Sequence, residues 1–394
     1  MRVVIVGENY VAGGADKMTK ILCEQLEFEE VFLFINHDDD FSVLCNPELP
    51  SNVKLIKYKV PTLAQIGEFV NSFTNWKWLF YPLKALSILL RYPYILFLIC
   101  YFYFKFKSIN PNVCISNNGG YPGGEINRSA TIASSLLQKC KVFHIVHNMP
   151  TKSPKILSVF EDIYDSILDK RAIFIADSKA IINSMYEIRN FKRDLRLVYL
   201  GTEELSLEKK KKEIEKVNLL NIASLDSRKN QLFLLKVINK VVKKFPNSLK
   251  LTIVGSEAEE NYKEKLLDFI KKNTLDDYIE FVDFTKNITL FFEENDIFIL
   301  SSTEEGFPLV NLMAMDASMP IISTKAGGTD EQVEHGINGY IIQQNDSDSM
   351  EESICKYIND KEKIYLHGEL SKKIYEEKFS FTKMINNYKS TFNS

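Results

Sequence analysis

Short, uninterrupted apolar runs recur along this chain, and amphipathic stretches follow them. The first run, "RVVIVG" (2–7), is apolar along its length, and "KMTKILCEQL" (17–26) then places apolar residues at helical spacing. A strand that is apolar on both faces needs helices on both sides of its sheet. The pattern therefore predicts an α/β fold built on a parallel, doubly wound sheet.

This alternation occurs twice, and a highly charged segment, "LEKKKKEIEK" (207–216), separates the two halves. We predict two doubly wound Rossmann-like domains, at 1–202 and 203–378, with a C-terminal helix at about 379–394 that packs back on the first. In such sheets ligands bind beyond the carboxyl ends of the strands, so we expect the two domains to face a cleft. The expected strands are "VFLFIN", "VKLIKY", "NVCISN", "VFHIVH" and "AIFIADS" in the first half, and "LLNIAS", "LKLTIVG", "YIEFVDF", "DIFILSS" and "PIIST" in the second.

The composition narrows the class of protein. A chain of 394 residues is too long for one compact core. The net charge of −3 gives no reason to expect nucleic acid as a partner. The six cysteines are scattered, without a Cys-x-x-Cys pair or a Cys/His cluster, so we expect no metal site, no disulfide framework and a cytoplasmic location. The apolar start reads as a strand and not as a signal peptide.

One segment lacks acidic residues altogether. Between Phe69 and Gly124 there is no Asp or Glu, whereas basic and aromatic side chains are frequent. This mixture predicts contact with an anionic membrane surface through about 76–107. The longest uncharged run, Tyr92–Phe104, is too short to span a bilayer and contains Pro93. A buried helix pair whose lysines reach outward to water is the open alternative.

Three loops of the first domain carry candidate ligand groups. "GENYVAGGADK" (7–17) leads into a helix, where Gly13 and Gly14 either let a phosphate approach free N–H groups or form a plain turn. The glycine-rich loop of "SNNGGYPGGEINR" (116–128) either shapes a site for a polar ligand such as a sugar or is an ordinary turn. Its candidate acceptor-binding residues are Tyr121, Glu125 and Arg128.

Two histidines lie in "VFHIVHNMP" (142–150), three positions apart. On a strand they face opposite sides of the sheet. His147 comes at the end of the strand, where ligand-facing residues lie, and is the functional candidate. His144 fits a position in the core.

The second domain has three comparable loops. "SLDSRKNQ" (224–231) places Arg228 and Lys229 before a helix, where they either meet a diphosphate or form a solvated pair. "STEEGFPLVNLMAMD" (302–316) reads as the start of a ligand-facing helix. "KAGGTDEQVEHGINGY" (325–340) has a glycine pair between a strand and a helix.

The ordered set of these motifs resembles the retaining nucleotide-sugar glycosyltransferases of family 4, of the surface-polysaccharide type, which have the GT-B fold. The set is "GGADK", "VHN", "ADS", "SRKNQ", "FILSSTEEGFPLV", Pro320, "AGGTDE" and "GINGY". The resemblance implies metal-independent transfer of a hexosyl group, with retained configuration, from a UDP or GDP sugar to a hydroxyl of an acceptor. It requires no cofactor. Together with the segment that lacks acidic residues, the resemblance implies that the acceptor is a lipid-linked saccharide at the inner face of a bacterial membrane.

The resemblance also implies roles for individual residues. Glu305 and His147 approach the donor sugar and are the catalytic candidates. Cationic side chains and helix N–H groups stabilise the diphosphate. The donor-binding candidates are Gly13, Gly14, Arg228, Lys229, Gly306, Phe307, Leu309 and Val310.

Two positions depart from the family pattern. Ala223-Ser224 replaces the usual Gly-Arg, so Arg228 is the expected second cation. Met313 replaces a ribose-binding Glu, and Asp316, one helical turn on, is the hypothetical substitute. The alternative is an exposed Asp316 beside a space-filling Met313. "HDDD" (37–40) is read as a surface loop and not as a metal-binding motif.

Two other functions stay open. The departures suit a catalytically degenerate partner subunit of another glycosyltransferase. Without membrane contact, the same motifs suit a soluble glycosyltransferase with a small acceptor.

Overall fold

The computed structural model describes residues 1–8, 14–36, 49–205, 207, 213–285 and 287–394. Gly13, the "HDDD" segment and residues 208–212 of the charged segment 207–216 lie outside these residues. The described chain forms two compact units. The first comprises Met1–Asp177, Ile181–Val198 and Tyr388–Ser394, and the second comprises Ser178–Ala180 and Tyr199–Asn387.

The first unit is built on a seven-stranded parallel sheet in the order β3-β2-β1-β4-β5-β6-β7. The chain runs outward from β1 in one direction and then from β4 in the other, so the order reverses between these two strands. The strands are β1 (Arg2–Gly7), β2 (Glu30–Asn36), β3 (Val53–Tyr58), β4 (Val113–Asn118), β5 (Lys141–Val146), β6 (Ile173–Ala176) and β7 (Arg196–Leu197).

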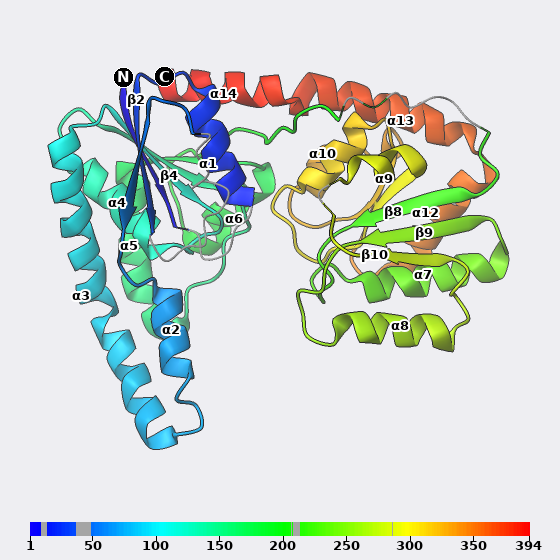
Figure 1. Ribbon diagram of the computed structural model, residues 1–394, viewed down its shortest axis with the longest axis horizontal. Helices are drawn as coiled ribbons and strands as arrows, with labels where there is room; N and C mark the ends of the chain where they lie inside the picture. The colour runs from blue at the N-terminus through cyan, green and yellow to red at the C-terminus, as the bar shows by residue number, and fades with distance from the viewer. Residues whose placement is uncertain (9–13, 37–48, 206, 208–212, 286) are drawn as a thin grey trace. The chain divides into compact units, whose positions relative to one another are not determined.

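Helices cover this sheet, as the apolar strands require (Figure 1). Their bounds are α1 (Gly14–Gln25), α2 (Leu63–Asn71), α3 (Lys77–Ile109), α4 (Glu125–Ser135), α5 (Ser158–Arg171) after the short turn η1 (Lys155–Leu157), and α6 (Lys179–Arg189), which starts in the second unit. The C-terminal half of α3 packs on the sheet, where Phe102 and Phe106 contact Phe34 at ring distances of 6.4 and 5.1 Å.

Helix α3 differs from the sequence prediction. It is one continuous helix of 33 residues and contains both Pro82 and Pro93. A proline inside a helix removes one backbone hydrogen bond, which a long helix tolerates. By length and composition α3 is able to cross a membrane, with a mean hydropathy of 1.8 in a window of which only 17% is buried. The sequence prediction considered only the uncharged run Tyr92–Phe104, which is too short to span a bilayer, whereas the helix that contains this run is long enough.

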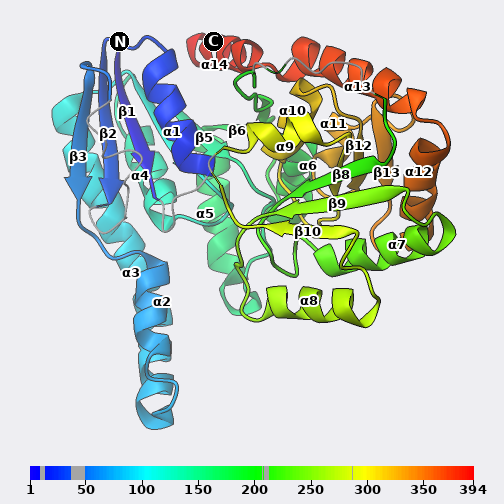
Figure 2. The same ribbon diagram turned by 45° about the vertical axis from the view of Figure 1, so that its right-hand side comes forward.

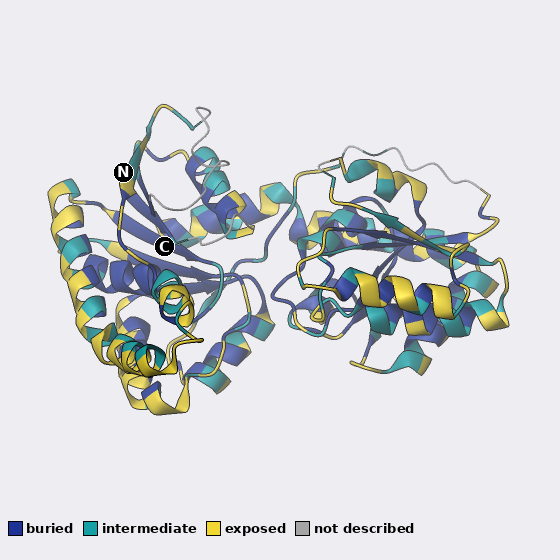
Figure 3. Ribbon diagram, turned by 60° about the horizontal axis from the view of Figure 1, so that its bottom comes forward, coloured by how far each residue is buried: buried dark blue, intermediate teal, exposed yellow. Residues whose placement is uncertain are grey.

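The α2–α3 pair projects from the rest of the first unit (Figure 2). The buried residues of α3, Ile95, Leu98, Phe102 and Phe106, all follow Arg91. The preceding half is largely exposed, as its yellow ribbon shows (Figure 3). The alternative of a buried helix pair therefore fails for this projecting part.

The second unit has a six-stranded parallel sheet in the order β10-β9-β8-β11-β12-β13. Helices α7 and α8 lie on one face, and α9, α10 and α13 on the other (Figure 1). The order reverses between β8 and β11. The strands are β8 (Val217–Ile222), β9 (Leu249–Val254), β10 (Ile279–Val282), β11 (Ile297–Leu300), β12 (Ile321–Thr324) and β13 (Gly339–Ile342). The helices are α7 (Gln231–Lys244), α8 (Tyr262–Lys272), α9 (Thr289–Glu294), α10 (Leu309–Asp316), α11 (Thr329–Gln332), α12 (Ser347–Asn359) and α13 (Glu362–Ile374), followed by the π-helical turn η2 (Tyr375–Phe379).

The last helix, α14 (Phe381–Asn393), returns to the first unit with its final residues. Phe392 packs edge-on against Phe143 at 4.8 Å, and Arg196 donates to the carbonyl of Thr391 at 2.7 Å. The sequence boundaries, after 202 and after 378, lie within about ten residues of those that the structure shows at Val198 and Asn387.

Candidate functional site

The reversal point of the second sheet brings two candidate residues together. Lys229 follows β8 and Glu305 follows β11, and Lys229 Nζ lies 2.6 Å from Glu305 Oε1. Both side chains are largely buried, with 15% and 8% exposed. Loops at such a reversal point are where open α/β sheets bind ligands. The pair is therefore the centre of a candidate site.

Hydrogen bonds hold these two loops in register. The backbone N–H of Thr303 donates to the carbonyl of Arg228 at 2.8 Å, and Ser301 Oγ donates to the carbonyl of Lys229 at 2.8 Å. Asp226 closes the turn before α7, because its Oδ1 accepts from the N–H of Lys229 at 2.9 Å. Lys229 is thus presented to Glu305 by a constrained turn.

A glycine pair after β12 packs directly under the Glu305 loop. A Cβ on Gly327 would lie 1.8 Å from the carbonyl oxygen of Glu305, and Gly327 has a φ of +54°. The N–H of Gly328 donates to the carbonyl of Gly306 at 3.0 Å. Only glycine permits this close approach, so Gly327 and Gly328 determine the position of the Glu305 loop.

Helix α10 begins next to this loop, with Pro308 as its N-cap and no capping side chain. The N–H groups of the first turn, including those of Leu309 and Val310, point away from the helix and suit a negatively charged group. Phe307 serves this region only through its backbone. Its ring is buried against Tyr199 at 5.3 Å and Phe379 at 5.5 Å.

Arg228 is the accessible cation of the candidate site. Its side chain is 47% exposed and lies 3.8 Å from Asp226. One guanidinium nitrogen reaches the carbonyl of Glu304 at 3.4 Å. Arg228 is therefore placed beside the Lys229–Glu305 pair, as the sequence predicted.

Asp316 does not take part in this site. Its Oδ1 pairs with Lys372 at 2.5 Å, and its Oδ2 accepts from the N–H of Leu205 at 2.5 Å. Its side chain is only 2% exposed. The hypothesis that Asp316 binds ribose was wrong, because both of its carboxylate oxygens are already bonded. One links α10 to Lys372 of α13, and the other links α10 to the backbone at Leu205. The alternative of an exposed Asp316 was also wrong.

In the first unit, His147 lies at the end of β5 with both ring nitrogens bonded. Nδ1 lies 2.6 Å from Asp177 Oδ2, and Nε2 lies 2.6 Å from Asn117 Oδ1. The amide of Asn117 is oriented by its Nδ2, which donates to the Ala15 carbonyl at 2.7 Å and to Thr19 at 2.8 Å. Nε2 of His147 must therefore donate to Asn117.

Nε2 of His147 thus carries a proton, and Nδ1 faces the carboxylate oxygen Oδ2 of Asp177. One proton is therefore shared between Nδ1 and this oxygen. Asp177 is completely buried, and this burial raises the pKa of its carboxyl, although His147 lowers it. For His147 to contact a substrate, its bond to Asn117 has to open. Asn117 and Asp177 were missed as candidate residues, although both end or follow apolar strands where ligand-facing side chains lie.

His144 is a core residue. It is fully buried, stacks on Phe174 at 4.8 Å, and its Nδ1 lies 2.8 Å from Thr131 Oγ1. Burial lowers its pKa to about 3, and Arg128 adds to the effect.

Two of the three acceptor candidates are unavailable to a ligand. Arg128 is fully buried and pairs with Glu161 at 2.9 Å and with Glu125 at 2.5 Å. Tyr121 is 1% exposed, and its hydroxyl donates to Asp165 at 2.6 Å. The sequence prediction was wrong for these two, because a buried ion cluster of the first unit uses their polar groups. Glu125 belongs to this cluster but also lines a pocket.

Gly14, the described member of the first glycine pair, begins α1, and a Cβ there would meet no atom of the described residues within 4 Å. Close packing against the described part of the chain therefore does not require glycine at this position. Among the described residues, no three His, Cys, Asp or Glu side chains form a group that could hold a metal ion.

Comparison with known proteins identifies the second unit. Residues 202–378 match the family model of glycosyl transferases group 1. An uncharacterized glycosyltransferase of Haemophilus influenzae is 32% identical over 45% of this chain, and the chain spans about half, 49%, of its length. The capsular polysaccharide biosynthesis glycosyltransferase CapM of Staphylococcus aureus is 24% identical over 71% of this chain and 76% of its own.

The fold has whole-chain counterparts among solved structures. Anabaena HepE in complex with UDP superposes with a TM-score of 0.73 at 17% identity and covers 100% of both chains. The expected fold, two Rossmann-like units of the GT-B type, is thereby confirmed. Within this fold, residues 202–378 are similar to the glycosyl transferases group 1.

Proposed function

We propose that this chain is a retaining, metal-independent hexosyltransferase that uses a UDP or GDP sugar. It transfers the sugar to a hydroxyl of a lipid-linked saccharide during bacterial surface-polysaccharide synthesis. The observation that carries the proposal is the Lys229–Glu305 pair at the reversal point of the second sheet, 2.6 Å apart and next to the start of α10.

The chemistry of this site suits a nucleoside diphosphate leaving group. Transfer leaves additional negative charge on the diphosphate, and fixed cations with helix N–H groups stabilise such charge. Lys229 and Arg228 supply the cations, and the first turn of α10 supplies the N–H groups. Without a donor, Glu305 neutralises Lys229, so Lys229 can exchange this carboxylate for a phosphate when the donor binds. Glu305 is then released toward the sugar.

Similar proteins support the donor and the pathway. HepE was solved with UDP, and CapM is named for capsular polysaccharide biosynthesis. We extend a UDP-type donor and a surface-polysaccharide product to this chain on the strength of these names and of the shared loops. His147 remains the second catalytic candidate, acting after its bond to Asn117 opens.

The α2–α3 pair supports a peripheral position on the inner face of the membrane. Trp76, Trp78 and Leu89 are 60%, 74% and 72% exposed, and Lys77 and Lys84 accompany them. Aromatic and basic side chains together suit the interface of an anionic bilayer. We place the membrane contact at about 76–107, the segment predicted from the sequence.

A donor screen tests the proposal. Purified protein is mixed with UDP, GDP and their common sugars, and its melting temperature is recorded, followed by NMR of the anomeric proton of any transferred or hydrolysed sugar. We expect one nucleotide class to raise the melting temperature of the protein. The sugar product should have the same anomeric configuration as the sugar of the donor. EDTA should leave the rate unchanged.

The same screen separates the alternatives. If no nucleotide or nucleotide sugar binds, the chain is a degenerate partner subunit. The chain is a soluble enzyme with a small acceptor if three results occur together: a donor binds, small soluble acceptors are glycosylated, and anionic vesicles are not bound. An inverted anomer would overturn the retaining mechanism alone.

A further inference from the structure

Helix α5 has acidic side chains on its buried face and apolar side chains on its exposed face. Its buried residues are Tyr164 and Leu168 together with three acids, Glu161, Asp165 and Asp169. Five large apolar side chains of η1 and α5 are between 38% and 78% exposed: Ile156, Val159, Phe160, Ile163 and Ile167. A helix at the surface of a soluble protein usually has the reverse arrangement. We call these five exposed residues the α5 stripe.

The inward acids fix the rotation of α5 about its own axis. Glu161 pairs with Arg128 at 2.9 Å, and Asp165 pairs with Arg189 at 2.7 Å. Asp169 accepts two backbone N–H groups of the segment after α6, both at 3.1 Å. Turning the stripe inward would break these buried ion pairs, which is strongly unfavourable. The outward direction of the stripe is therefore a fixed property of the first unit.

The spacing of the stripe makes it one continuous surface. Ile156, Phe160, Ile163 and Ile167 follow one another by four, three and four positions, which aligns them on one side of a helix. Val159 lies one turn before Ile163 on the same side. A contiguous exposed apolar surface of this kind marks an interaction site with a protein or a membrane.

The charges around the stripe are mostly positive. Within residues 151–171, all of which the structure describes, the exposed cations are Lys152 and Lys155 at one end and Lys170 and Arg171 at the other. Asp162 is the one exposed acid of this stretch, because the remaining three acids are buried. The stripe therefore has a basic group at each end, which suits an anionic partner.

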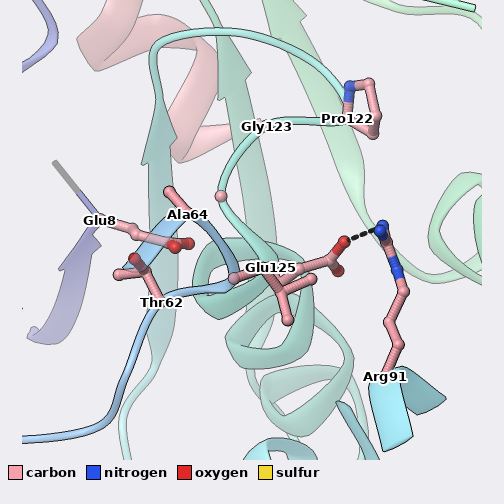
Figure 4. Close-up of a pocket in the computed structure, with 9 residues that line it drawn as sticks. Glu8, Thr62, Ala64, Arg91, Pro122, Gly123 and Glu125 are labelled. Atoms are coloured by element: carbon pink, nitrogen blue, oxygen red, sulfur yellow. Dashed lines mark hydrogen bonds and ion pairs between the residues drawn. The ribbon is translucent and has the colours of Figure 1, made fainter. Parts of the chain in front are cut away.

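The stripe is joined to α3 at the point where the projecting half of that helix begins. The ring of Phe160 packs on the ring of Tyr92 at 4.8 Å. The neighbouring Arg91 pairs with Glu161 of α5 at 3.0 Å and with Glu125 of α4 at 2.5 Å, the second of which Figure 4 shows beside a pocket. Helix α5 and the base of the projection are thus held together by an apolar and an ionic contact.

The exposed apolar surface continues from this contact along α3. Ile88 and Leu96 lie one helical turn before and after Tyr92, and both are exposed. Tyr92 in turn contacts Phe160 of the α5 stripe. The proposed membrane-binding segment and the stripe therefore share one apolar surface, although about 60 positions of sequence separate them.

An anionic bilayer fits this surface better than a second copy of the chain. Both ends of the stripe are basic, so two paired copies would bring cations together in either relative direction. The segment of α3 that continues the stripe is rich in aromatic and basic side chains and has no acid. Helices that lie in the membrane interface combine an apolar face with lysine and arginine in the same way.

Helix α3 does not cross the bilayer in this arrangement. Its second half packs on the sheet, and Arg91 is tied to the buried ion cluster. Only residues 77–90 remain for insertion, and fourteen residues extend about 21 Å, less than a hydrocarbon core of ~30 Å. The contact is therefore confined to one leaflet.

We propose that the α5 stripe is a second membrane-binding element, which lies in the interface of an anionic bilayer with its apolar side chains below the headgroups. The basic residues at its two ends contact the headgroups. Because α5 is fixed to the base of the α2–α3 pair, the two elements together set the orientation of the first unit on the membrane. This inference rests on the proposed membrane contact at 76–107 and adds a surface outside that segment.

A single tryptophan in the stripe tests its depth directly. The chain has two tryptophans, so Trp76→Phe/Trp78→Phe/Ile163→Trp leaves the one tryptophan on α5 and keeps aromatic rings on α3. The matched control has Leu366→Trp in place of Ile163→Trp, because both positions are 56% exposed and Leu366 belongs to the second unit. Mixed vesicles of phosphatidylglycerol and phosphatidylcholine brominated on its acyl chains are the probe. We expect strong quenching of the tryptophan at 163 and none at 366.

An affinity measurement tests the same surface without added charge. We expect Val159→Gln/Ile163→Gln to bind mixed vesicles of phosphatidylglycerol and phosphatidylcholine at least tenfold more weakly than wild type, because both apolar side chains leave the interface. Leu290→Gln/Leu366→Gln removes two exposed leucines of the second unit and should bind as wild type does. The melting temperature should change little in either variant, since all four positions are exposed.

The outcomes separate this inference from the membrane contact on which it rests. Absent quenching at 163, or unchanged affinity of Val159→Gln/Ile163→Gln, overturns the assignment of α5. If the emission of Trp76 and Trp78 in wild type still shifts with the same vesicles, the contact through α2–α3 stands. If wild type binds no vesicles, both fail. A wild-type dimer in sedimentation that Val159→Gln/Ile163→Gln dissociates would assign the stripe to a second copy and overturn the proposal.

Discussion

Lys229 and Glu305, 76 positions apart in the sequence, form a 2.6 Å ion pair that joins the loops after β8 and β11. Both loops are also linked through the backbone, so removal of the ion pair leaves their geometry supported by the Thr303–Arg228 hydrogen bond at 2.8 Å. The pair is thus suited to exchange a partner without disturbing the fold around it.

Glu305→Gln tests the role of this carboxylate. We expect the rate of donor hydrolysis or transfer to fall about 100-fold or more, as for removal of a preorganised polar group from an active site. The melting temperature should change little. Glu304→Gln is the matched control, because Glu304 is the exposed neighbour and should keep wild-type kinetics. Equal rates in wild type and Glu305→Gln would remove Glu305 from the catalytic candidates.

Gly327→Ala tests whether the glycine pair positions the Glu305 loop. The added methyl group would lie 1.8 Å from the carbonyl oxygen of Glu305, so the loop has to move. We expect a loss of activity of at least tenfold and a lower melting temperature. Gly336→Ala has a φ of +78° but open space around it, so it controls for backbone strain alone. If both variants lose activity equally, close packing at Gly327 is not the cause.

Asp316→Asn separates a structural from a ligand-binding role. The substitution weakens the contact with Lys372 and one hydrogen bond to Leu205, for which we expect a loss of about 1–3 kcal/mol in the free energy of unfolding. Nucleotide affinity, measured by calorimetry, should be unchanged, and Lys372→Met should cause a similar destabilisation. Weaker nucleotide binding at unchanged stability would restore Asp316 as a ribose ligand.

The two tryptophans of the chain, Trp76 and Trp78, both lie at the projecting end of the α2–α3 pair. Their fluorescence therefore reports membrane contact directly. We expect vesicles with anionic lipid to shift the emission to the blue, and high salt to weaken the effect by screening. Leu89→Asp should reduce the vesicle affinity at least tenfold, because a charge at an exposed apolar position opposes insertion.

Leu366→Asp is the control for this experiment. Leu366 is 56% exposed but lies on α13 of the second unit. Its substitution should leave vesicle binding unchanged. An unshifted emission spectrum in wild type would remove the proposed membrane contact.

His144 makes the stability of the first unit depend on pH. Its pKa falls from 6.5 to about 3 through burial, so the unfolded chain takes up the proton at a higher pH than the folded chain. Stability contributed by the neutral ring is complete above pH 6.5 and decreases between pH 6.5 and 3, by about 1.4 kcal/mol per pH unit. Urea unfolding followed by far-ultraviolet circular dichroism should show a shallower decrease in stability below pH 6.5 in His144→Gln. Parallel curves would contradict the prediction.

Most strands were predictable because a parallel sheet is covered on both faces, which leaves continuous apolar runs in the sequence. The helix at 231–244 was also evident, since its apolar spacing is regular and charged residues end it. Strand β13 was not predicted, because its four residues, Gly339–Ile342, carry too short a pattern. Helix α3 was not predicted as one element, because prolines and dispersed cations hide its continuity.

The candidate site divides in the same way. Glu305, Lys229 and Arg228 were found from the sequence, because residues after buried strands gather at one edge of a parallel sheet. Tyr121, Arg128 and Asp316 were misassigned, because each pairs with a side chain that is distant in the sequence. The partners are Asp165, Glu161 and Lys372, which lie 44, 33 and 56 positions away. Such pairings arise only when the chain folds.

The sequence by itself determined the two doubly wound units and the loops that carry chemistry, because strand burial and local turns leave short-range patterns. Only the tertiary structure decided which polar side chains are available to a ligand. Availability depends on which distant groups occupy each donor and acceptor, and burial makes an unpaired polar group costly. That rule draws Arg128 and Asp316 into internal pairs.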